Sequence, residues 1–252
     1  PVLDEKRVPI DVICMEDILP GRCVQQNRAN RVVVMAGGRG SRLDPITRII
    51  PKPLLPVGDK PMLELIMESF VKCGFHDFLL SINYRKDFIK TWLAERGNLP
   101  GSVTCVEEQE FLGTAGSLAL MKDFLKETFF VSNCDILVDV NYTSALQFHC
   151  ENGYALTVIG ALKKINVPYG VIYLKGGDFD RIEEKPDVPL IVNTGVYLLE
   201  PECAALIAEG EKIDMPNLID RVQASGKRVG VFPVHRKWID IGQWGEYKQA
   251  LE

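Results

Sequence analysis

Residues 32–56 read VVVMAGGRGSRLDPITRIIPKPLLP, and this stretch says most about the fold and the chemistry of the chain. Residues 31–35 form a run of β-branched and apolar residues of strand length, and a glycine-rich turn follows at 36–40. Small residues let the backbone approach a ligand closely, and successive N–H groups in such a turn form an anion-binding concavity. The stretch therefore predicts a buried strand that ends in a polyphosphate-binding loop.

Two commoner phosphate loops do not fit this sequence. A Walker A loop ends in Gly-Lys-Ser/Thr, whereas residues 40–42 read GSR. A dinucleotide-binding loop needs its third glycine where Leu43 stands, and it opens a helix at once. Here prolines follow at 45, 51, 53 and 56, so we expect a stiff extended loop that carries Arg42 and Lys52 beside the glycines. The alternative is a surface loop with two solvated cations.

Composition limits the classes of function. The chain has 252 residues, of which 46% are hydrophobic, and a formal net charge of −5, which argues against general nucleic-acid binding. It has no apolar run long enough for a membrane span and no basic-apolar signal peptide, so we expect a cytoplasmic protein. The seven cysteines are scattered without a C-x-x-C pair, and the three histidines stand far apart, which predicts reduced thiols and no zinc site.

From residue 31 onward, strand-like and helix-like segments alternate. This pattern predicts an α/β fold with a doubly wound, mixed but mainly parallel sheet and flanking helices. Expected strands lie at 78–82, 103–106, 129–132, 155–162, 170–174, 179–183, 191–199 and 229–234. Expected helices lie at 61–73, 86–94, 114–125, 144–150, 204–208, 215–224 and from 244 onward.

Two carboxylates are placed where the ligands of a metal ion are expected. Asp135 follows the apolar strand at 129–132, at the carboxyl end where open α/β sheets bind their ligands. Asp240 lies in the sequence WIDIG at 238–242, another apolar strand that breaks into a glycine turn. Mg²⁺ prefers such hard oxygen ligands. Either aspartate alone is more often an N-cap or turn residue, but their joint presence after the glycine loop favours a metal site.

The pattern G-G-x-G-[S/T]-R-L-x-P-x-T followed by P-K-P-L-L-P, matched without a gap at 37–56, resembles the sugar-nucleotidyltransferase signature. The visible departure is Asp44, a position that varies in the family. The resemblance implies a Rossmann-like, GT-A-like nucleotidyltransferase fold and Mg²⁺-dependent transfer of a nucleotidyl group from a nucleoside triphosphate to a sugar 1-phosphate. It places Arg42 and Lys52 on the triphosphate and Asp135 and Asp240 on the metal.

The same resemblance assigns the binding residues. The segment EQEFLGTAG at 108–116 resembles the family's L-G-T-A-G loop near the base, where Glu108 and Gln109 are candidate base contacts. This loop is more similar to that of mannose-type and heptose-type guanylyltransferases than to that of thymidylyl- and uridylyltransferases, so we expect GTP. The implied nucleotide-binding residues are Ala36, Gly37, Gly38, Arg39, Gly40, Ser41, Glu108, Gly113 and Thr114. The implied sugar-phosphate residues are Tyr169, Gly170, Glu184 and Lys185 of an E-K-P motif, Asn193 and Thr194.

Residues 1–30 do not belong to the alternation and are expected to form an N-terminal arm before a catalytic domain at 31–252. They are expected to contain two strands, at 1–5 and 8–13, and a short helix at 15–19. The wording PVLDEKRVPIDVI and EDILPG resembles the closing part of a CBS domain, a regulatory module that often binds adenine nucleotides. An arm that packs on the catalytic domain is an equally good interpretation. The absence of an initiator methionine suggests a piece of a longer protein.

Three functions compete. The first is the sugar-1-phosphate nucleotidyltransferase. The second is a non-catalytic regulatory protein that binds a nucleotide sugar on the same fold, which would not need both metal aspartates. The third is a glycosyltransferase of related architecture, which expects an Asp-x-Asp motif, whereas Asp135 and Asp139 are separated by three residues. The sequence names neither the sugar nor the oligomeric state, so a homo-oligomer stays open.

Overall fold

The computed structural model describes residues 2–3, 9–11, 27–235, 238–242 and 244–251. The chain divides into two compact units. The larger unit contains residues 22–159, 194–232 and 236–252, and the smaller one contains residues 1–21, 160–193 and 233–235. None of the helices in the described part of the chain combines the length and the hydropathy that a membrane span requires.

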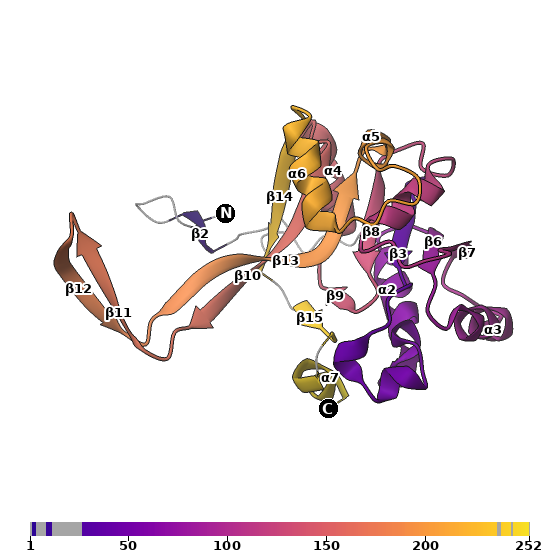
Figure 1. Ribbon diagram of the computed structural model, residues 1–252, viewed down its shortest axis with the longest axis horizontal. Coiled ribbons are helices and arrows are strands. Elements are labelled where there is room, and N and C mark those ends of the chain that lie inside the picture. Colours follow the sequence, from indigo (N-terminus) through magenta and orange to yellow (C-terminus); the bar gives the residue numbers. More distant parts are fainter. Residues whose placement is uncertain (1, 4–8, 12–26, 236–237, 243, 252) are drawn as a thin grey trace. The chain divides into compact units, whose positions relative to one another are not determined.

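A seven-stranded sheet organises the fold, in the order β14-β10-β13-β8-β3-β6-β7 (Figure 1). Strands β6 and β8 both pair parallel with β3, β7 pairs parallel with β6, and β13 pairs antiparallel with β8. The strands are β3 (Val32–Met35), β6 (Asp77–Ile82), β7 (Ser102–Glu107), β8 (Phe129–Asn133), β10 (Leu156–Asn166), β13 (Asp187–Leu199) and β14 (Val229–Val234). The predicted mixed, mainly parallel sheet is confirmed.

Helices cover both faces of this sheet. The long helices are α2 (Met62–Val71), α3 (Lys86–Arg96), α4 (Tyr142–Asn152), α6 (Met215–Ala224) and α7 (Trp244–Leu251), and α5 (Pro201–Ala205) is short. Alternate residues of β3 and β8, such as Val33 and Val131, join one core with residues of α5 and α6. On the other face, Phe130 packs edge-on against Phe70 of α2 and Tyr142 of α4. Successive side chains of a strand point to opposite faces of the sheet, so these strands contribute to a hydrophobic core on each face.

The proline-rich stretch after the glycine loop corrects one expectation. Instead of an extended loop, it folds into three 3-10 turns, η1 (Ser41–Leu43), η2 (Ile46–Arg48) and η3 (Lys52–Leu54), before a small β4–β5 hairpin (Pro56–Val57 and Lys60–Pro61). Each turn needs an N–H only from its last residues, such as Leu54, which donates to Pro51 O at 2.9 Å. A proline at the start of a turn has no backbone N–H, and the turn does not use an N–H at that position. No α-helix lies between residues 41 and 56.

A second correction concerns residues 114–125. A helix was expected there, but the structure has only a 3-10 helix, η4 (Gly116–Met121). The backbone just before it is committed elsewhere, since Ala115 donates to Ile213 O at 3.0 Å and Ile213 donates to Leu112 O at 3.0 Å. The loop is thereby paired with a distant segment, and Ala115 is held at φ −137°, outside the α-helical range, so no α-helix begins at Thr114. The other strands and helices predicted after residue 30 are present, with ends shifted by up to four residues.

Shorter pairings complete the fold. In the larger unit, β9 (Ile136–Val138) pairs antiparallel with β15 (Trp238–Asp240). In the smaller unit, β11 (Gly170–Lys175) and β12 (Asp178–Glu184) form a hairpin, and β1 (Val2–Leu3) pairs with β2 (Pro9–Asp11). The two predicted N-terminal strands are thus present in part. The expected helix at 15–19 lies outside the described residues, and the CBS-like segment stays a prediction.

Candidate active site

A cavity of about 550 Å³ opens in the larger unit at the carboxyl ends of the parallel strands. Residues that follow β3, β6, β7 and β8 line it, because parallel neighbours end at one edge of the sheet. Most of the residues predicted from sequence to bind the nucleotide or the metal are among them. They are Gly37, Gly38, Arg39, Gly40, Ser41, Arg42, Lys52, Glu108, Gly113, Thr114 and Asp135.

The glycines of the loop meet different surroundings. Gly40 has φ +67°, and a Cβ there would lie 3.1 Å from Lys52 Cβ, so both its conformation and its packing require glycine. A Cβ on Gly37 would lie 2.7 Å from Glu108 Oε1. Gly38 has open space on its side-chain side and lines the cavity. Two glycines thus close the loop tightly on the protein, and Gly38 leaves room for a ligand beside the backbone. Ala36, also predicted, is buried beneath the loop.

Three cations surround the loop. Arg39 and Arg42 are exposed, and the Arg39 guanidinium lies 5.9 Å from the centre of the Tyr84 ring. Lys52 differs, since its residue is only 8% exposed. Its ammonium donates a hydrogen bond to Asp135 Oδ2 within a nearly buried ion pair. The predicted phosphate-binding lysine and the predicted metal-binding aspartate are therefore in direct contact.

The two aspartates converge although 105 positions separate them in the chain. The antiparallel pairing of β9 and β15 sets Asp240 opposite Ile136, and Ile241 N–H donates to Asp135 O at 2.9 Å. A Cβ placed on Gly242 would lie 2.6 Å from Asp240 Oδ1 and 2.9 Å from Asp135 Oδ2. Both carboxylate oxygens thus flank one small space that only glycine leaves open. Two carboxylate oxygens beside one small space are the kind of hard ligands that Mg²⁺ prefers, so Asp135 and Asp240 are the residues that would hold it.

The loop at 108–116 is built around a buried carboxylate. Glu108 is 3% exposed, and its Oε1 accepts from the Ser81 hydroxyl while its Oε2 accepts from Leu112 N–H at 2.9 Å. Each carboxylate oxygen has two lone pairs, so acceptor capacity is left toward the cavity that Glu108 lines. Gln109, the other candidate base contact, is exposed.

The L-G-T-A-G residues attach this loop to the start of α6. A Cβ on Gly113 would lie 2.5 Å from Ile213 O, so the glycine permits close backbone contact. Thr114 N–H donates to Asp214 Oδ1 at 2.9 Å, and the Thr114 hydroxyl accepts from Met215 N–H at 2.8 Å. Thr114 therefore caps the helix α6 from a distant loop. Thr114 thus has a structural role at the start of α6, in addition to the nucleotide-binding role that was predicted for it.

The predicted sugar-phosphate residues fall mainly in the smaller unit. There Lys185 is exposed and has φ +49°, an uncommon conformation for a residue with a side chain. Two hydrogen bonds hold it, from Lys185 N–H to Tyr169 O at 3.2 Å and from Asn166 Nδ2 to Lys185 O at 3.2 Å. Such outliers cluster at functional sites. The neighbouring Gly170 leaves room for Glu184, whose Oε2 would lie 2.9 Å from a Cβ at that position.

The last two predicted residues stand where the chain passes from the smaller unit to the larger one. Asn193 is exposed and belongs to the smaller unit. Thr194 belongs to the larger one and is 1% exposed, with its hydroxyl donating to Ile159 O at 2.7 Å. A buried hydroxyl that is already bonded to the backbone supports the strand. The position of Lys185 and its neighbours relative to the cavity stays a prediction.

Sequence reasoning missed several residues of the cavity. Asn83 and Tyr84 follow β6, and Asn133 ends β8, so all three satisfy the strand-end rule that singled out Asp135. Asn133 also explains Gly195 (φ +82°), where a Cβ would lie 2.6 Å from Asn133 Nδ2. Phe111 lines the cavity and is 44% exposed, and nothing in the sequence marks it apart from its place before L-G-T-A-G.

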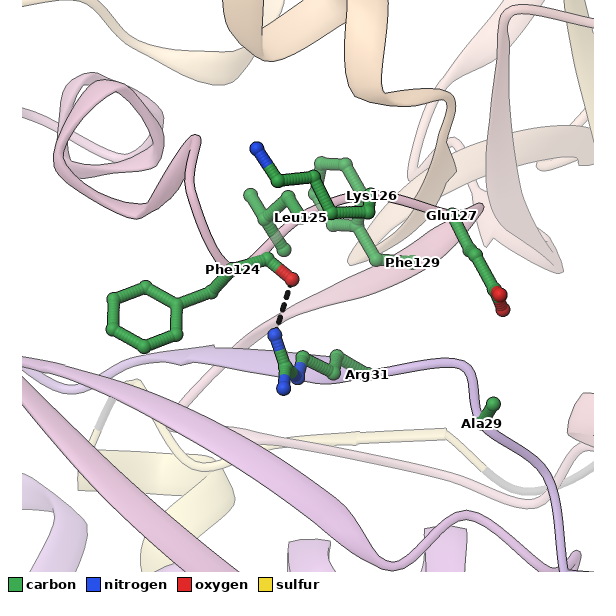
Figure 2. A pocket seen from close by; sticks show the side chains of 7 residues that line it. All are labelled: Ala29, Arg31, Phe124, Leu125, Lys126, Glu127 and Phe129. Atoms are coloured by element: carbon green, nitrogen blue, oxygen red, sulfur yellow. Dashed lines mark hydrogen bonds between the residues drawn. The ribbon is translucent and has the colours of Figure 1, made fainter.

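A second cavity, of about 220 Å³, lies near the start of β3 and has a different character. Figure 2 shows Arg31 reaching Phe124, to whose carbonyl oxygen its guanidinium donates. Arg31 Nε also donates to Asp77 Oδ2 at 2.7 Å. Its cation is thus engaged by the protein on two sides. The cavity at the carboxyl ends of the strands, which combines cations, carboxylates and glycines, is the candidate active site.

Comparison with known proteins identifies the family of the chain. A family model described as nucleotidyl transferase matches residues 31–252. The chain belongs to this family. A mannose-1-phosphate guanyltransferase of Yarrowia lipolytica is 34% identical over 224 residues, which cover 84% of this chain and 60% of that protein. A UTP–glucose-1-phosphate uridylyltransferase of Synechocystis is 28% identical over 245 residues, which cover 88% and 62%.

This nucleotidyl transferase chain therefore spans about six tenths of the length of the curated relatives it matches. Among solved structures, HddC from Yersinia pseudotuberculosis complexed with GMP-PN has a TM-score of 0.70 at 24% identity, and the match covers 88% of this chain and 98% of that one. At this identity the likeness shows the fold. One of these relatives is named as a guanyltransferase and the other as a uridylyltransferase, so proteins similar to this chain are named for more than one base.

Proposed function

We propose that this chain transfers a nucleotidyl group from a nucleoside triphosphate to a sugar 1-phosphate. The observation that carries the proposal is the convergence of Asp135, Asp240 and Lys52 beside a glycine loop. A polyphosphate needs cations and backbone N–H groups, and its divalent ion needs carboxylates; the cavity offers both within one unit. A sugar phosphate and a triphosphate are both anions and repel each other. Screening of this repulsion by cations is therefore the main requirement of the reaction.

In the proposed reaction, an oxygen of the sugar phosphate attacks the α-phosphorus of the triphosphate. A new P–O bond forms while the bond from the α-phosphorus to the bridging oxygen breaks, and pyrophosphate leaves with that electron pair. Arg42 and Lys52 would bind the phosphates that leave, and the N–H groups around Gly38 would hold them close to the backbone. The substrate itself supplies the nucleophile, so the chain needs none.

Asp135 and Asp240 would hold Mg²⁺, which when bound neutralises charge on the phosphates during the transfer. Lys185 would bind the phosphate of the sugar, and its neighbours Glu184 and Asn193 would face the sugar hydroxyls. For the base we propose guanine. Glu108 offers a buried carboxylate to the cavity, and guanine presents two N–H donors on one edge, which match such an acceptor.

The test is release of pyrophosphate from guanosine, uridine, cytidine, adenosine and thymidine triphosphates with a panel of sugar 1-phosphates. We expect turnover with GTP, and we expect Asp135→Asn and Asp240→Asn each to lower kcat by at least about 100-fold, since charge stabilisation in the transition state is lost. Asp123→Asn is the matched control, because the Asp123 side chain is fully exposed. Normal turnover in the two active-site variants would refute the assignment.

A further inference from the structure

We infer that Lys52 couples the binding of the nucleotide to the binding of the divalent cation, because its ammonium occupies the Asp135 oxygen that faces Asp240. The inference rests on the proposed function, since it takes the triphosphate as the ligand that draws Lys52 away. It concerns the regulation of the site by its own residues.

The geometry identifies the oxygen in question. Asp135 Oδ2 is the atom that would lie 2.9 Å from a Cβ on Gly242, and Asp240 Oδ1 would lie 2.6 Å from the same point. This same Oδ2 accepts the hydrogen bond from Lys52 Nζ. Asp240 Oδ1 accepts from Gly242 N–H at 2.7 Å. The carboxylate oxygen that a cation between the aspartates would use is thus already paired with a positive charge.

Because both side chains are nearly buried, the ion pair of Lys52 and Asp135 competes strongly with a divalent cation for the Asp135 carboxylate. The side chains of Lys52 and Asp135 are only 10% and 12% exposed, so solvent screens their attraction weakly. An ammonium and a divalent cation on one carboxylate also repel each other. Asp135 therefore offers little affinity to a cation while Lys52 stays in place.

The nucleotide can remove this competition. Lys52 Cβ and Cδ would lie 3.1 and 3.3 Å from a Cβ on Gly40, so the stem of the lysine runs along the phosphate loop. Lys52 also lines the cavity with Gly38 and Arg42. A triphosphate bound on the loop gives the ammonium new oxygens within reach of a flexible side chain, and Asp135 is released. By linkage, nucleotide and cation then each raise the affinity for the other by the same factor.

The first experiment titrates the nucleotide-free protein with Mn²⁺ and follows the free ion by electron paramagnetic resonance. We expect Lys52→Met to bind Mn²⁺ about 10-fold more tightly than the wild type, and Lys52→Met with Asp240→Asn to lose this gain. Lys60→Met is the matched control, because it removes a lysine that is paired with Glu68 at 2.6 Å outside the cavity. Equal Mn²⁺ affinities for the wild type and Lys52→Met would overturn the inference.

The second experiment measures binding of the α,β-methylene analogue of GTP in the presence of EDTA. Asp135→Asn frees Lys52, whereas Asp240→Asn removes an equal charge and leaves the ion pair intact. We therefore expect Asp135→Asn to bind the analogue about 10-fold more tightly than the wild type, with a clearly smaller gain in Asp240→Asn. Equal gains would show a general effect of charge and contradict the coupling. Circular dichroism establishes whether each variant is folded. If Lys52→Met does not fold, the comparison of Asp135→Asn with Asp240→Asn decides the question.

Neither experiment measures turnover, so the two proposals can fail separately. Coupled binding in a chain that releases no pyrophosphate would keep the inference and refute the proposed enzyme. Uncoupled binding in an active enzyme would do the reverse.

Discussion

Gly40 and Gly38 stand two positions apart in the phosphate loop, yet substitution should affect them in opposite ways. Alanine at Gly40 must adopt φ +67°, and its Cβ would press on Thr47 Cγ2 at 3.0 Å and on the stem of Lys52. We expect Gly40→Ala to lower the free energy of unfolding by about 1–2 kcal/mol. Gly38→Ala meets open space, so we expect normal stability but markedly weaker nucleotide binding. Urea unfolding and nucleotide titration of both variants check this contrast, and equal stabilities would contradict it.

His149 predicts a pH dependence of stability. Its side chain is fully buried, with Nδ1 2.8 Å from Thr157 Oγ1 and Nε2 3.1 Å from Glu200 Oε1. Burial disfavours the charged ring and lowers its pKa below 6.5, while Glu200 partly opposes this shift. The unfolded chain then binds more protons just below pH 6.5, so the stabilising contribution is present above that pH and is lost as the pH falls through the folded pKa. We expect urea unfolding to show lower stability at pH 5.5 than at 7.5.

The matched variants are His149→Gln and His76→Gln, the second of which replaces a half-buried histidine. His149→Gln should reduce the difference in unfolding free energy between the two pH values, whereas His76→Gln should keep more of it. An unchanged difference in His149→Gln would assign the pH dependence to other groups.

At the scale of single residues, the sequence predicted part of the site for a simple reason. Asp135 could be found because a polar residue after a buried strand lies at the ligand-binding edge, and Asp240 because its motif matches the family. Asn83 obeys the same strand-end rule but carries no charge that would set it apart. Phe111 could not be found, since its place on the cavity depends on how the loop closes on the segment at 211–215.

Among the elements, the attachment of the 108–116 loop to α6 makes a prediction about Thr114. Its hydroxyl accepts from Met215 N–H, so Thr114→Val leaves a helix N-terminus without its cap. We expect a loss of about 1 kcal/mol in the free energy of unfolding, together with weaker nucleotide binding because this loop lines the cavity. Thermal unfolding and nucleotide titration measure both. Thr104→Val, on an exposed position of β7, is the control, and equal behaviour of the two variants would show that the cap is unimportant.

The element predictions succeeded where local pattern decides and failed where pairing at a distance decides. Helix α6 (Met215–Ala224) and strand β14 (Val229–Val234) have the predicted ends, because apolar periodicity and turn residues bound them. The helix expected at 114–125 shortens to a 3-10 helix because Ala115, which pairs with Ile213, has φ −137° outside the α-helical range, and no local pattern reveals this distant contact. The turns at 41–54 were missed because proline permits 3-10 turns as well as extended chain.

For the whole molecule, the two units predict a division of labour. The cavity of the candidate active site belongs entirely to the larger unit, and Lys185 belongs to the smaller one. We therefore expect Lys185→Ala to raise KM for the sugar 1-phosphate by about 10- to 100-fold, the loss of a charged hydrogen bond, while the affinity for the nucleotide stays unchanged. Initial rates and nucleotide titration separate the two effects. Lys175→Ala, which replaces an exposed lysine of the same unit, should change neither, and an equal effect on both substrates would refute the division.

The pairing of β9 with β15 also has a consequence for synthesis. The ribosome adds the second aspartate 105 residues after the first, which at about 5–20 residues per second means roughly 5 to 20 s later. During that interval the nascent polypeptide already has its glycine loop and one member of the acidic pair, but not the strand that delivers the other. On the proposed function, a nascent chain without β15 lacks one of the two carboxylates that would hold the divalent ion, so we expect no nucleotidyl transfer before Asp240 is brought beside Asp135.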